Sequence, residues 1–86
     1  MKSILITGCS SGIGLDSALA FRDAGWQVLA SCRKQADCTS MSEVHGLASV
    51  RIDYEDEASI TAGFRSALDL TNNKIDVLFN NGAYAI

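Results

Sequence analysis

The sequence predicts an α/β fold in which a four-stranded parallel sheet is covered by helices. Short apolar runs rich in β-branched residues recur along the 86 residues, and segments with helical spacing separate them. This β-α-β-α-β-α-β order requires crossover connections, so neighbouring strands run parallel. Right-handed crossovers then favour a doubly wound half-sheet with strand order 3-2-1-4.

The first strand–helix pair covers residues 4–6 and 12–24. Ile4-Leu5-Ile6 is a short apolar run, typical of a strand buried on both faces. Leu15, Ala18 and Leu19 then fall at helical spacing. Gly25 follows, where a helix end favours a left-handed residue, so we expect the helix to end there.

The second pair consists of a strand over 27–31 and a weaker helix over 35–44. We expect this helix to turn Met41 and Val44 towards the core and to end at Gly46.

The last helix has the clearest pattern and lies between two further strands, 49–52 and 75–79. Its apolar stripe predicts the face towards the core and consists of Ile60, Phe64, Ala67 and Leu68. Acidic residues 55–57 cluster at its start, where they favour the helix dipole. The final strand is expected to leave an open sheet edge at residues 77–79.

Composition and charge exclude several function classes. The net charge of −3 gives no sign of the surplus of basic residues that binds nucleic acid or an acidic membrane surface. The apolar runs are too short to span a bilayer. The first residues pass directly into a strand without the core of a signal peptide, so we expect a cytoplasmic protein of one domain.

Three cysteines, Cys9, Cys32 and Cys38, lack metal-ligand spacing. We interpret them as reduced thiols of a cytosolic protein and expect no metal site. Cys9 lies near a helix N-terminus, a position that can lower the pKa of a thiol.

A glycine-rich segment between the first strand and helix predicts a phosphate-binding loop. Gly8 permits a tight turn, Gly12 removes a side chain where phosphate approaches, and Gly14 lets the helix pack close to the sheet. The helix N-terminus attracts anions. Serine hydroxyls could add donors, although serine also suits any turn. The candidate residues are Gly8, Ser10, Ser11, Gly12, Ile13 and Gly14.

The turn after the second strand is basic. A fold that binds NAD usually carries an acid here for the ribose 2′-hydroxyl, whereas this chain has Arg33 and Lys34. A guanidinium can bind a 2′-phosphate through two hydrogen bonds, with the lysine as a second charge. The pair therefore favours NADP(H) over NAD(H). The alternative is an ordinary pair of solvated basic residues. The nearby Asp37 slightly weakens the positive electrostatic field of the pair.

Two further polar segments follow the third and fourth strands, at the edge where parallel sheets bind ligands. Asp53 and Tyr54 come after the third strand, and Asp53 could instead cap the next helix. Asn80-Asn81-Gly82-Ala83 follows the fourth strand, about 70 residues after the glycine loop.

These four segments, in this order, resemble the short-chain dehydrogenase/reductase family over the whole chain. The resemblance implies a Rossmann fold with Asp53 at the adenine ring and with Asn80, Gly82 and Ala83 along the ribose. Tyr54, next to Asp53, is a further candidate cofactor-binding residue. The family commonly has Asn-Asn-Ala-Gly at the last segment, and here the final two residues are exchanged. The exchange moves the glycine and therefore the freedom of the backbone there.

The resemblance also implies hydride transfer between a nicotinamide and an alcohol or carbonyl substrate. Family members use a serine and a Tyr-x-x-x-Lys pair further along the chain. Neither Tyr54 nor Tyr84 has a lysine four residues on, so we assign no catalytic residue. We expect residues 1–86 to be the N-terminal part of an NAD(P)-binding domain, from a longer homo-oligomeric enzyme whose partner is a small-molecule substrate.

Two other functions fit parts of the pattern. A non-catalytic dinucleotide-binding or sensor module would use the same glycine loop. A methyltransferase half-fold also has such a loop, but it requires an acid at the end of the second strand, where this chain has Cys32 and Arg33.

Overall fold

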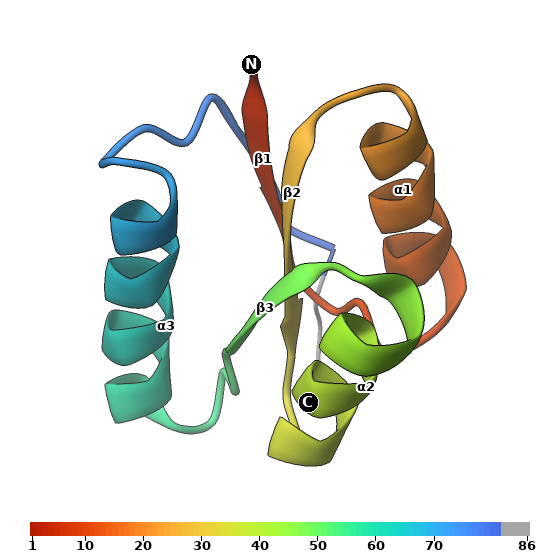
Figure 1. The fold of residues 1–86 in the computed structure, drawn as a ribbon. Coiled ribbons are helices and arrows are strands. Elements are labelled where there is room, and N and C mark those ends of the chain that lie inside the picture. Colours follow the sequence, from red (N-terminus) through yellow and green to blue (C-terminus); the bar gives the residue numbers. More distant parts are fainter. Residues whose placement is uncertain (82–86) are drawn as a thin grey trace.

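The computed structural model describes residues 1–81 as alternating strands and helices around one parallel sheet (Figure 1). The elements are β1 (Ser3–Ile6), α1 (Gly12–Asp23), β2 (Gln27–Cys32), α2 (Gln35–His45), β3 (Ala48–Arg51), α3 (Glu57–Leu70) and β4 (Val77–Phe79). The predicted element order is confirmed.

The four strands form one sheet in the order β3-β2-β1-β4, with every pair parallel. β1 is central, so Leu5 lies between Leu29 of β2 and Leu78 of β4. This is the predicted 3-2-1-4 order of a Rossmann-like half-sheet, and it aligns the carboxyl ends of all four strands at one edge.

Helices cover both faces of the sheet, with α1 and α2 on one face and α3 on the other (Figure 1). Ile4 and Ile6 of β1 pack with Ala18 of α1 and Met41 of α2. On the opposite face, Leu5 belongs to a cluster with Ala67 of α3. Because side chains alternate along a strand, β1 supplies apolar residues to both layers, which explains its uninterrupted apolar sequence.

The helix ends follow the glycine signals. Gly46 ends α2 in the left-handed conformation with φ of 66°, and Gly25 follows α1 with φ of 92°. The fourth strand is shorter than expected, because 75–76 lie outside β4. Ile75 still packs against the α3 layer, so its apolar character reflects burial rather than strand pairing.

Two expectations about helix faces are wrong. Val44 is 72% exposed, although Met41 of the same helix is buried. Leu68 of α3 is 36% exposed, because the buried line of that helix runs instead through Ser59, Gly63 and Ala67. These three residues are spaced by four, and they set which side of α3 faces the sheet.

The contact at Gly63 explains this choice of face. A Cβ at Gly63 would lie 2.5 Å from Ile52 Cγ1 and 2.7 Å from the carbonyl oxygen of Arg51. The absence of a side chain therefore lets α3 approach β3 closely, and Leu68 is carried towards solvent.

The β4 edge is open within residues 1–81, as expected. β1 is its partner, and Val77 and Leu78 are 40% and 50% exposed. Across the described residues, no helix combines the length and apolar character needed to cross a membrane.

Candidate functional site

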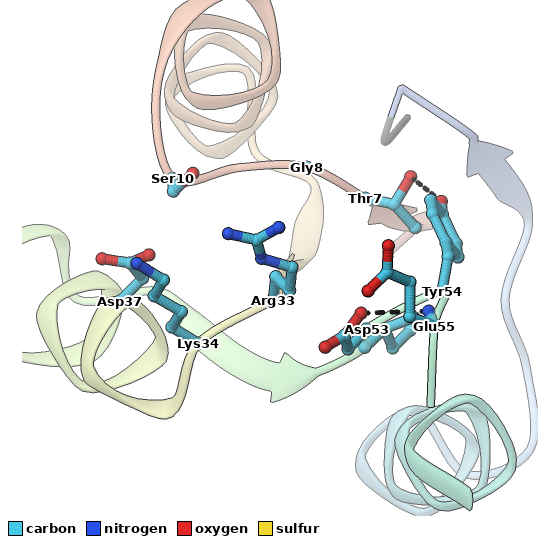
Figure 2. A pocket seen from close by; sticks show the side chains of 10 residues that line it. Thr7, Gly8, Ser10, Arg33, Lys34, Asp37, Asp53, Tyr54 and Glu55 are labelled. Carbon is cyan, nitrogen blue, oxygen red and sulfur yellow. Dashed lines mark hydrogen bonds between the residues drawn. The ribbon is translucent and has the colours of Figure 1, made fainter. Parts of the chain in front are cut away.

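A pocket of about 300 Å³ opens at the carboxyl ends of β1, β2 and β3 (Figure 2). Its lining residues come from the segments that follow these strands and are Thr7, Gly8, Ser10, Arg33, Lys34, Asp37, Ile52, Asp53, Tyr54 and Glu55. The first three of the four polar segments found in the sequence thus meet in one concave site, which is where open parallel sheets bind their ligands.

The glycine loop runs from the end of β1 to α1 and is fixed by the neighbouring strands. The Thr7 amide donates to the Phe79 carbonyl at 3.1 Å, and the Cys9 amide donates to the Ser31 carbonyl at 2.9 Å. Gly8 and Gly12 have φ of 69° and 63°, in the left-handed region that favours glycine.

Gly14 is buried beneath this loop. A Cβ at this position would collide with the Gly8 carbonyl oxygen and lie 2.7 Å from Asn81 Nδ2. The loop and the first turn of α1 can pack this closely only because residue 14 has no side chain. The sequence predicted a close approach of the helix to the sheet at Gly14, and the structure shows this close approach to the loop instead.

The N-terminus of α1 is free of acidic residues in its first turn. Ser11 precedes the helix, and its hydroxyl makes no capping hydrogen bond. The first-turn amides therefore keep the partial positive charge that attracts anions. Ser10 lines the pocket, whereas Ser11, Gly12 and Ile13 are exposed beyond its lining, with Ile13 70% exposed.

The basic turn between β2 and α2 forms another wall of the pocket. Figure 2 shows the Arg33 side chain extending into the space between the glycine loop and Asp53, with Lys34 nearer to Asp37. Within residues 1–81, neither basic side chain forms an ion pair. Two cations therefore face the pocket without a paired carboxylate.

Asp53 closes a tight turn at the pocket and does not cap α3. Its Oδ1 accepts a hydrogen bond from the Glu55 amide at 3.0 Å. The N-cap of α3 is Asp56, whose carboxylate accepts from the Ser59 amide at 3.3 Å. The capping alternative for Asp53 is thus wrong, because the helix begins three residues later than that role requires.

The Tyr54 hydroxyl lies between two polar side chains at the strand ends. It is 2.8 Å from Thr7 Oγ1 and 2.6 Å from Asn80 Oδ1. Asn81 Nδ2 donates to the Gly8 carbonyl at 3.3 Å, which ties the segment after β4 to the glycine loop. Gly82 and Ala83, also named from the sequence, lie outside the described residues.

Sequence reasoning missed some of the lining. Thr7, Ile52 and Glu55 received no contact role, and Asp37 was considered only for its charge. Thr7 could have been found from its position directly after β1, since the first residue beyond a parallel strand faces the ligand edge. Glu55 had no such signal, because acids at a helix start are common.

The expectation for Cys9 is wrong. Its side chain is fully buried, and Sγ donates to the Ile6 carbonyl at 3.1 Å. Burial raises the pKa of the Cys9 thiol to about 11, and burial likewise raises the pKa of Cys32 to about 12. The thiol lies in the core rather than at the helix N-terminus, so desolvation outweighs the helix dipole. No metal-binding cluster occurs among residues 1–81.

Comparison with known protein families shows to which family this chain belongs. The family described as short chain dehydrogenase matches residues 2–86. The chain belongs to the short-chain dehydrogenase family. This membership agrees with the glycine loop, the strand order and the position of the pocket described above.

Relatives within the family support the assignment. The chain is 42% identical over 85 residues to the uncharacterized oxidoreductase YbbO of Escherichia coli, covering 99% of the chain and 31% of that protein. It is 37% identical over 81 residues to an NADPH-dependent 1-acyldihydroxyacetone phosphate reductase of Schizosaccharomyces pombe, covering 93% and 27%. The chain thus spans about a third or less of the length of these relatives.

Solved structures share the fold. An actinorhodin polyketide ketoreductase with NADPH superposes with a TM-score of 0.82 at 25% identity, over 96% of this chain and 33% of that one. A hydroxysteroid dehydrogenase from Escherichia coli gives a TM-score of 0.81 at 27% identity, over 92% and 35%.

Proposed function

We propose that residues 1–86 are the N-terminal, cofactor-binding part of an oxidoreductase domain that uses NADP(H). The enzyme would transfer hydride between the nicotinamide and an alcohol or carbonyl group of a small molecule. Family membership supports the reaction class. The pocket at the carboxyl ends of β1, β2 and β3 supports the location of the cofactor.

The observation that carries the choice of NADP(H) is the basic turn in the pocket wall. Arg33 and Lys34 line the pocket, and β2 ends with Cys32 instead of an acid. A 2′-phosphate would replace water around two cations that have no ion-pair partner in residues 1–81. The names of the yeast reductase and the ketoreductase structure, both of which mention NADPH, point the same way.

The remaining pocket residues fit other parts of a dinucleotide. The pyrophosphate would lie on the glycine loop from Gly8 to Gly14, at the amide end of α1. The adenosine would lie against Asp53 and Tyr54. Asn80, with Gly82 and Ala83 after it, would border the ribose.

These residues bind and orient the cofactor, and the bound nicotinamide supplies the hydride. We assign no catalytic residue among them, because neither tyrosine of the chain is part of a Tyr-x-x-x-Lys pair. We further propose a cytoplasmic, homo-oligomeric enzyme. The net charge of −3 argues against binding to nucleic acid or to an acidic membrane surface.

Titration with NADPH and NADH by calorimetry tests the proposal. Trp26 precedes β2 and packs edge-on against Phe21 of α1, at the end of the sheet opposite to the pocket. The heat of binding is therefore a better signal than the fluorescence of Trp26. The chain should bind NADPH more tightly than NADH. Arg33→Ala should weaken NADPH binding roughly tenfold to hundredfold, the usual loss for a hydrogen bond between charged groups.

Arg65→Ala is a matched control. Arg65 is an exposed arginine of α3 outside the pocket lining. Its removal changes the net charge as much as the removal of Arg33 does, but away from the cofactor. Tighter binding of NADH, or an equal loss in both variants, would contradict the assignment. A non-catalytic binding module would pass this titration, and hydride transfer by the full-length protein then distinguishes the two functions.

A further inference from the structure

Arg51, the last residue of β3, connects the two turns that form opposite walls of the pocket. Its Nε donates to the carbonyl oxygen of Arg33 at 3.0 Å. Its two terminal nitrogens lie 3.7 Å from Asp53 Oδ2 and 3.3 Å from Asp56 Oδ2. Arg51 itself does not line the pocket.

The position of Arg51 in the sheet explains how it reaches both turns. Arg51 pairs with Cys32 in the β2–β3 register, so Arg33, which follows Cys32, lies one position further along the neighbouring segment. Asp56 is anchored in turn, because its carboxylate caps α3. A planar guanidinium with several donors can join these groups in one fixed geometry, which a lysine cannot do.

We propose that Arg51 is a positioning residue that strengthens the preference of this site for NADP(H). The inference rests on the proposed function, because it assigns the 2′-phosphate to Arg33. By holding the Arg33 carbonyl, Arg51 fixes the start of the basic turn relative to the acidic turn at Asp53. The Arg33 guanidinium is thereby pre-oriented towards the pocket, which lowers the entropy lost when a phosphate binds.

The positive charge of Arg51 also favours binding of NADP(H). Asp53 lines the pocket, and its carboxylate is paired with Arg51. Without Arg51, the negative charges of Asp53 and Asp56 would repel a 2′-phosphate and attract the Arg33 guanidinium away from it. NADH has no 2′-phosphate, so its binding depends far less on either effect.

The expected size of the effect is modest. The side chains of Arg51, Asp53 and Asp56 are 36%, 21% and 44% exposed, so solvent screens their ion pairs. Arg51→Met should weaken NADPH binding by roughly threefold to tenfold and leave NADH binding nearly unchanged.

Arg22 provides a closely matched control. Its guanidinium also pairs with an aspartate, Asp23 at 3.0 Å, and donates to a backbone carbonyl, that of His45 at 2.9 Å. It is 41% exposed and joins α1 to the end of α2, outside the pocket lining. Arg22→Met therefore removes the same types of contact away from the cofactor.

The test is the ratio of the NADH and NADPH dissociation constants, measured by calorimetry on the full chain. The ratio should fall in Arg51→Met and stay at the wild-type value in Arg22→Met. A loss of folded protein alone would weaken both cofactors equally, so the ratio separates positioning from stability. Arg51→Lys keeps the charge without the planar geometry and should give an intermediate ratio.

The outcomes separate this inference from the proposed function. A wild-type ratio near one would overturn the NADP(H) assignment and the role of Arg51 with it. A wild-type preference for NADPH whose ratio stays unchanged in both Arg51 variants would overturn the role of Arg51 alone. If Arg51→Met does not fold, the ratio in Arg51→Lys decides, and an unchanged value there overturns the inference.

Discussion

The Tyr54 hydroxyl lies 2.6 Å from Asn80 Oδ1, although the two residues follow strands at opposite edges of the sheet. Tyr54 comes after β3 and Asn80 after β4, so the phenol ring reaches across the ends of the two inner strands. The Thr7 hydroxyl, after β1, donates to the same Asn80 oxygen at 3.2 Å. With Oδ1 accepting from both hydroxyls, Asn80 Nδ2 is left as the donor of this amide.

Tyr54→Phe should lower the free energy of unfolding by about 1 kcal/mol, because it removes the hydroxyl that joins the two edges. Urea denaturation of the variant and the wild type measures this loss. A double-mutant cycle with Asn80→Ala isolates the contact, and the combined loss should be smaller than the sum of the single losses. Full additivity would mean that the contact contributes nothing to stability.

Gly14→Ala should destabilise the chain by about 1–3 kcal/mol, the usual range for overpacking. Alanine in a helix is otherwise favoured over glycine, so a loss identifies the collision with the Gly8 carbonyl oxygen as its cause. Asp16→Ala, at an exposed position of the same helix, should change stability by less than about 0.5 kcal/mol. A Gly14→Ala variant more stable than the wild type would refute the close packing.

Alkaline pH should destabilise the fold through its buried thiols. The pKa of Cys9 rises from 9.0 to about 11 on folding. Between these values the unfolded thiol has released its proton while the folded thiol keeps it. The unfolded state then binds fewer protons, so the free energy of unfolding decreases as pH rises. This contribution is fully present below pH 9.

Urea midpoints measured from pH 8 to 11 test this expectation. The midpoint of the wild type should fall more steeply with pH than that of Cys9→Ala, in which one such thiol is missing. The remaining slope in that variant includes Cys32, whose pKa is raised to about 12. Identical slopes would show that Cys9 is not protected by burial.

Much of the fold could be predicted because its signals are local. Apolar runs, helical spacing and glycines at element ends indicate strands, helices and their boundaries without knowledge of distant contacts. The helix-face error at Leu68 arose where a distant contact decided, whereas no contact in the structure explains the exposure of Val44. The approach of Gly63 to β3 moved Leu68 towards solvent, and no local pattern reports such an approach.

The candidate site was predicted in the same uneven way. Glycine, basic and acidic residues after successive strands could be assigned to one edge, since the carboxyl ends of parallel strands coincide. The expectation of a lowered pKa for Cys9 was wrong because the direction of its side chain depends on how the loop packs against the core. The links made by Arg51 and Tyr54 join residues on different strands, so sequence spacing gave no sign of them.

The element order, the glycine loop and the residue types available at the ligand edge follow from local patterns along the chain. These features follow from backbone conformation and from burial along single strands and helices. Contacts between distant segments, by contrast, set which side chains face the pocket, which are paired and which thiols are buried. Those properties depend on distances of a few ångströms between residues far apart in the chain, and packing of the strands and helices sets these distances.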